Sequence, residues 1–69
     1  MDNDTLNFYL EVVHDLIARD VPATVENISK HLAPANREDE IVAALAALVT
    51  EGRLVKSAKS QRVERYQLA

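Results

Sequence analysis

Apolar residues recur at helical spacing over the first part of the chain. Six of them fall on one helical face: Leu6, Tyr9, Leu10, Val13, Leu16 and Ile17. Asp4 or Thr5 can cap this helix, because a side-chain oxygen there accepts a free backbone N–H. Pro22 disfavours a helical conformation at Val21. The pattern therefore predicts a helix over about residues 5–19.

A second, shorter helix is predicted over about residues 25–32. Val25, Ile28 and Leu32 fall at positions i, i+3 and i+7, and Thr24 precedes them as an N-cap. Pro34 ends the pattern because a proline ring clashes with the preceding helical turn. The short connection over residues 21–23 can adopt an extended backbone conformation.

The third helix has the clearest signals, and we expect it over about residues 37–51. Its buried stripe consists of Ile41, Ala44, Leu45 and Leu48, with Val49 at the edge. Asn36 is the expected N-cap, and three acidic residues at 38–40 suit the positive end of the helix dipole. Gly52 stands where a left-handed residue commonly ends a helix.

After Gly52 the apolar period becomes that of extended chain. Residues 53–56 and 62–68 are strand candidates, and the polar residues 58–61 between them are typical of a turn. Tyr66 and Leu68 share one face of the second strand and are expected in the core. The chain is therefore predicted to be one α+β domain over residues 1–69, with three helices and then a two-stranded hairpin at about 53–68.

Three stretches carry a resemblance to the winged helix-turn-helix family. The run from Leu45 to Val55 is similar to the family's junction of leucine-x-x-leucine-x-x-x-glycine-x-leucine, residues 24–32 are similar to its second helix, and residues 65–68 to its last wing strand. The resemblance covers about residues 5–68. It implies DNA binding, with the third helix in the major groove and the hairpin, or wing, on the backbone or minor groove.

The distribution of charge is compatible with that role. The net charge is −3, but residues 1–51 hold ten acidic and three basic residues, whereas residues 52–69 hold five basic and one acidic. The expected phosphate contacts are Arg53, Lys56, Lys59, Arg62 and Arg65, with Arg37 as a groove contact. A hairpin that uses Lys and Arg only to protect its edge strand explains the same residues. The favoured hypothesis is a small DNA-binding regulator that forms a dimer.

The alternative hypothesis is a protein-interaction module that binds no nucleic acid. The outward face of the third helix is predicted to hold Asp39, Ala43, Ala46 and Thr50, flanked by Val42 and Ala47. It offers no Arg, Lys, Asn or Gln to read a base edge. Phe8 and Val12 lie outside the apolar stripe of the first helix. Phe8 either folds over its own domain's edge or joins Val12 in a partner contact. The candidate contacts to a partner or second copy are Phe8, Val12, Val42, Ala43 and Ala46.

Catalysis, metal binding and a membrane location are not expected. The chain has no cysteine and one glycine, and His14 and His31 are isolated in separate helices. No cofactor, metal or small-molecule substrate is indicated. No run approaches the roughly 20 apolar residues of a membrane span. The acidic first residues are unlike a signal peptide, so a cytoplasmic protein is expected.

Overall fold

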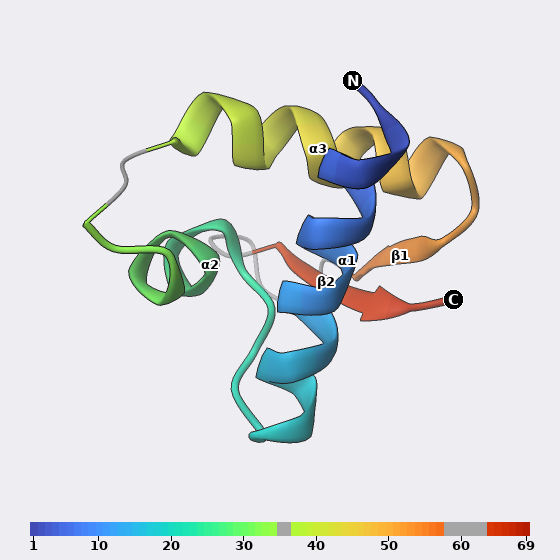
Figure 1. Cartoon of the computed structure of the whole chain (residues 1–69). Coiled ribbons are helices and arrows are strands. Elements are labelled where there is room, and N and C mark those ends of the chain that lie inside the picture. Colours follow the sequence, from blue (N-terminus) through green and yellow to red (C-terminus); the bar gives the residue numbers. More distant parts are fainter. Residues whose placement is uncertain (35–36, 58–63) are drawn as a thin grey trace.

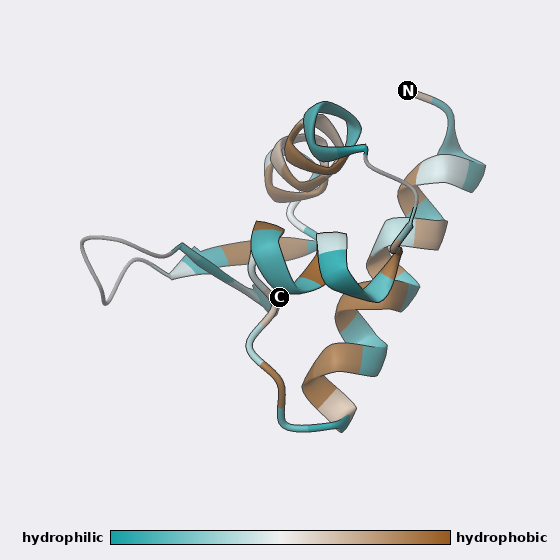
Figure 2. Ribbon diagram, turned by 90° about the vertical axis from the view of Figure 1, so that its left-hand side faces the viewer, coloured by the Kyte–Doolittle hydropathy of each residue, from teal (hydrophilic) through white to brown (hydrophobic). Residues whose placement is uncertain are grey.

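The computed structural model describes residues 1–34, 37–57 and 64–69. Its elements, in chain order, are α1 (Asn3–Ala18), α2 (Val25–His31), α3 (Glu38–Thr50), β1 (Leu54–Ser57) and β2 (Arg65–Leu68) (Figure 1). The two strands run outward from the helices, as Figure 2 shows. The α+β arrangement of a winged helix, predicted from the sequence, is confirmed.

Helix α1 begins earlier than predicted. Asp2 is its N-cap, and the Asp2 side chain accepts a hydrogen bond of 2.8 Å from the backbone N–H of Thr5. The predicted caps Asp4 and Thr5 were wrong, because both lie inside the helix. At the other end, Asp20 adopts a left-handed backbone with φ 59°, and the N–H of Val21 donates to the carbonyl oxygen of Leu16 over 2.9 Å. This arrangement satisfies a carbonyl group that the helix end leaves free.

The ends of α2 and α3 follow the sequence signals closely. Thr24 caps α2 as predicted, since its hydroxyl accepts from the N–H of Asn27 over 3.1 Å. Arg37 is the N-cap residue of α3 and makes no side-chain capping bond. The predicted cap, Asn36, lies outside the described residues. Gly52 has φ 76°, which confirms the left-handed residue expected after this helix.

One residue of the connection between α1 and α2, Ala23, pairs with the hairpin. Strands β1 and β2 are antiparallel, with Leu54 opposite Leu68 and Lys56 opposite Tyr66. On the other edge of β2, the N–H of Tyr66 donates to the carbonyl oxygen of Ala23 over 2.9 Å. The extended conformation allowed for residues 21–23 is therefore present at Ala23.

The core draws on every element. Its buried hydrophobic residues are Leu6, Tyr9, Val12, Val13, Leu16, Ala23, Ile28, Ile41, Ala44, Leu45, Leu48, Leu54 and Tyr66. The four residues of the predicted α3 stripe are all buried, and so are four of the six predicted for α1. This core fixes which faces of the helices remain for binding.

Three expectations about burial were wrong. Val12 was expected outside the core, yet it is only 6% exposed, because α1 packs against α2, α3 and β2 together and so buries a wide arc of its surface. Ile17 and Leu68 were expected in the core, yet they are 39% and 37% exposed. Both line an open space between the end of α1 and β2.

Candidate functional site

The outward face of α3 is the apolar surface expected from the sequence. Asp39, Val42, Ala43, Ala46 and Thr50 are all exposed, and Val42 has 49% of its surface accessible. Four of these five side chains are uncharged. Three of them, those of Val42, Ala43 and Ala46, are small and entirely apolar. The face therefore offers a shallow surface on which a second helix can approach closely.

The N-terminal end of α3 is strongly acidic. Glu38, Asp39 and Glu40 form its first turn, and Arg37 stands immediately before them. Arg37 is exposed, as a groove contact would require. Its single positive charge stands beside three carboxylates, so this end of the helix has an unfavourable charge for a phosphate backbone.

Arg53 is tied to the helical body at the base of the wing. Its Nη2 donates to Asn7 Oδ1 over 2.8 Å, and its Nη1 lies 3.8 Å from Glu51 Oε1. The side chain thus joins the start of β1 to α1. A phosphate contact by Arg53 would compete with these two interactions.

Lys56 is paired within the hairpin. Its Nζ lies 3.0 Å from Glu64 Oε1, and this hydrogen bond together with the negative charge of Glu64 raises the pKa of Lys56. Of the other wing residues, Arg65 is exposed and has no ion pair within the described part of the chain. Lys59 and Arg62 lie outside the described residues. The structure therefore leaves Arg65 as the one described wing cation without a carboxylate partner among residues 1–34, 37–57 and 64–69.

Phe8 is an apolar residue that the fold leaves half-exposed. Its side chain is 48% exposed, and its ring lies 5.3 Å from that of Tyr9 at an interplanar angle of 76°. This edge-to-face contact holds one side of the ring against α1. The rest of the ring remains accessible on the surface, where the sequence placed a partner contact. Val12, the other contact proposed on this helix, is buried and so is not accessible to a partner.

His31 on α2 contacts the carboxylate of Asp15 on α1. His31 Nε2 lies 3.6 Å from Asp15 Oδ2, and Arg19 Nε approaches the same carboxylate oxygen at 3.3 Å. The first contact joins α2 to α1, whereas the second lies at the C-terminal end of α1, where Arg19 is the C-cap. Within the three described stretches, no group of three potential metal ligands occurs, and no helix is long and apolar enough to cross a membrane.

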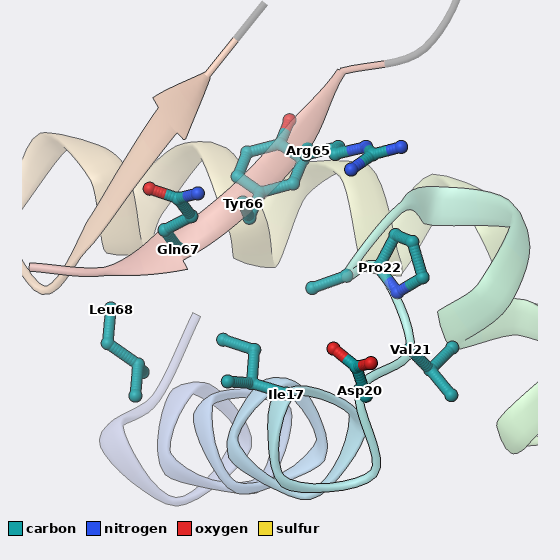
Figure 3. Close-up of a pocket in the computed structure, with 9 residues that line it drawn as sticks. Ile17, Asp20, Val21, Pro22, Arg65, Tyr66, Gln67 and Leu68 are labelled. Atoms are coloured by element: carbon teal, nitrogen blue, oxygen red, sulfur yellow. The ribbon is translucent and has the colours of Figure 1, made fainter.

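A space of about 330 Å³ lies between α1, residues 20–23 and β2 (Figure 3). This space was not expected from the sequence, since the apolar pattern predicts that Ile17 and Leu68 lie in the core. The one sequence feature that relates to this space is the break at residues 20–22. There the chain leaves the helix, and Pro22 has no N–H group with which to pair with a strand.

Comparison with known proteins adds no evidence on function, since no family model, no curated protein and no solved structure matches the chain. The features that bear on function are therefore the fold itself and three surfaces: the α3 face, the wing and the space beside β2.

Proposed function

We propose that this chain is a winged-helix protein-interaction module that binds a partner through the outward face of α3. The observation that carries the proposal is the exposure of Val42, Ala43 and Ala46 on the helix that would otherwise read DNA. Small apolar side chains on one exposed helical face suit the close approach of another helix. Val42 is half-exposed, so burying the rest of its side chain against a partner would contribute about 1 kcal/mol.

The composition of α3 also supports a protein partner over nucleic acid. Base edges in the major groove are read mainly by Arg, Lys, Asn and Gln. None of these residue types occurs anywhere in α3, whose sequence is EDEIVAALAALVT. The three carboxylates of its first turn repel phosphates, and they would instead suit a partner with basic residues at that end.

A substitution at the centre of the α3 face tests this function. Ala46→Arg places a long cation on the face, and arginine is a good helix former, so the domain is expected to fold. Complexes isolated through this chain should lose the bound partner, or the second copy, when Ala46 is replaced. The far-ultraviolet circular dichroism should not change. Glu26→Arg on the exposed surface of α2 is the matched control, and it should retain the partner. Equal retention by both variants would contradict the proposal.

DNA binding by the wing is a second candidate, favoured by the exposed Arg65 within the basic segment 52–69. Fluorescence anisotropy with mixed-sequence duplex DNA at low and moderate salt tests it. Wing binding predicts affinity that falls steeply with salt, by about 0.9 logarithmic units per logarithmic unit of salt for each phosphate neutralised. Arg65→Glu should weaken that binding, whereas Lys30→Glu on α2 should have a much smaller effect. Absence of binding at low salt would exclude the wing as a DNA-binding surface.

A further inference from the structure

Two exposed apolar side chains face a common space beside β2. Ile17 comes from the last turn of α1 and Leu68 from the end of β2, and both line the space (Figure 3). Ala23 and Tyr66, both buried, form the deeper wall. The space of about 330 Å³ is at the lower end of the range of roughly 300–1,000 Å³ typical of small-molecule sites. None of its lining residues belongs to α3, so this site is separate from the proposed docking face.

The space exists because the connection between α1 and α2 pairs with the outer edge of β2 at one residue, Ala23. If the antiparallel pairing of Ala23 with Tyr66 continued, Val21 would lie opposite Leu68. Instead the N–H of Val21 is used by Leu16 at the end of α1, and Pro22 has no N–H. The peptide groups of alternate strand residues point to the same edge. The N–H and C=O groups of Leu68 therefore point to the same edge of β2 as the N–H of Tyr66, which is the edge that borders this space.

Charged groups of opposite sign border the space. The carboxylate of Asp20 points toward it, and the guanidinium of Arg65 lies at its rim near Pro22 (Figure 3). Neither side chain has an ion-pair partner among the residues that the structure describes. Asp20 has a left-handed backbone, with φ 59°, directly after α1. This lining suits a small ligand with an apolar part and a positive charge beside Asp20, and it also has room for a negative charge beside Arg65.

We propose that this pocket binds an α-ammonium group with an adjacent apolar side chain. The ammonium group pairs with the carboxylate of Asp20, which points into the space. The apolar side chain contacts Ile17 and Leu68. Two sources share this chemistry: a free apolar amino acid, whose carboxylate would reach Arg65, and the N-terminus of a peptide.

Nuclear magnetic resonance titration of the ¹⁵N-labelled chain tests the site, with L-leucine amide as the probe. Saturable shifts in the millimolar range are expected at Ile17, Ala23 and Leu68. N-acetyl-leucine amide, which has no positive charge, should bind about 10-fold more weakly or worse, because a hydrogen bond to a charged group is lost. No saturable shift at these residues, or equal binding of the acetylated compound, would overturn the proposal.

Asp20→Asn removes the charge while keeping a side chain that tolerates a left-handed backbone. It should weaken leucine amide binding about 10-fold, whereas Asp39→Asn, the same change on the α3 face, should leave it unchanged. Binding of wild-type strength to Asp20→Asn would overturn the site. Two further ligands distinguish a free amino acid from a peptide N-terminus as the source of the ammonium group. Tighter binding of free leucine, lost in Arg65→Gln, supports the amino acid, and equal or tighter binding of leucyl-glycine amide supports a peptide N-terminus.

Discussion

The hydroxyl of Tyr9 on α1 donates a hydrogen bond of 3.0 Å to Glu40 Oε1 on α3, 31 positions further along the chain. Tyr9 is buried, and a buried phenol needs a partner for its O–H group. Burial first, and then this hydrogen bond, raise the pKa of Tyr9 above its ordinary value. The pair joins the two helices near the start of α3 and so helps to fix which face of α3 is turned outward.

Tyr9→Phe should lower the free energy of unfolding by about 1–2 kcal/mol, since it removes a hydrogen bond to a charged acceptor and keeps the ring in the core. Urea denaturation followed by circular dichroism measures the change. Glu40→Gln retains an oxygen acceptor and should cost less. An unchanged urea midpoint for Tyr9→Phe would show that the bond adds no stability.

Because of the raised pKa of Tyr9, we expect the folded chain to lose stability at alkaline pH. The pKa of Tyr9 in the folded chain is raised from 10.0, so the folded state favours the protonated phenol. Its contribution to stability is complete below the pKa of the unfolded chain and is lost as the pH rises through the folded value. The unfolding free energy of the wild type should therefore fall more steeply above about pH 10 than that of Tyr9→Phe. Parallel curves for the two proteins would contradict this prediction.

Gly52→Ala should destabilise the chain by about 1–2 kcal/mol through backbone strain alone. Gly52 has φ 76°, and no heavy atom lies within 4 Å of an added Cβ, so a steric clash is not involved. Gly52→Asn should cost less than alanine, because asparagine visits the left-handed region more readily. Thermal unfolding of the two variants measures the difference, and a larger loss with asparagine would point to packing instead.

Asp20→Gly should have the opposite effect at the other left-handed position. Asp20 has φ 59° at the end of α1, where glycine carries no Cβ penalty. We expect stabilisation of about 0.5 kcal/mol, after allowing for the greater entropy of glycine in the unfolded chain. This corresponds to a rise in Tm of about 2–4 °C for a domain of this size. A lower Tm would mean that the Asp20 side chain stabilises the turn.

The helices were predictable because their signals are local. Thr24, Gly52 and the stripe from Ile41 to Leu48 depend on neighbours within a few positions, and each is found as expected. The errors about burial depend on distant packing. The burial of Val12 is set by three elements that surround α1, and the exposure of Leu68 by the path of residues 20–22.

The candidate binding residues also divide into those set by local sequence and those set by distant contacts. The outward face of α3 follows from helical geometry and was predicted correctly as an exposed surface. The engagement of Arg53 by Asn7 joins positions 46 apart in the chain, and no local pattern indicates it. The sequence therefore located the charges of the wing but not which of them are already paired.

Site-specific photo-crosslinking at Ala46 tests the proposed docking face most directly. A photoreactive residue at position 46 should yield a defined protein product in native cells, and the additional change Val42→Asp should abolish it without unfolding the domain. The same residue at Glu26, on the exposed surface of α2, is the control and should yield no such product. A discrete protein adduct at position 46 alone is the result we predict. Absence of any protein adduct at position 46, or the same adducts from both positions, would contradict a docking function for α3.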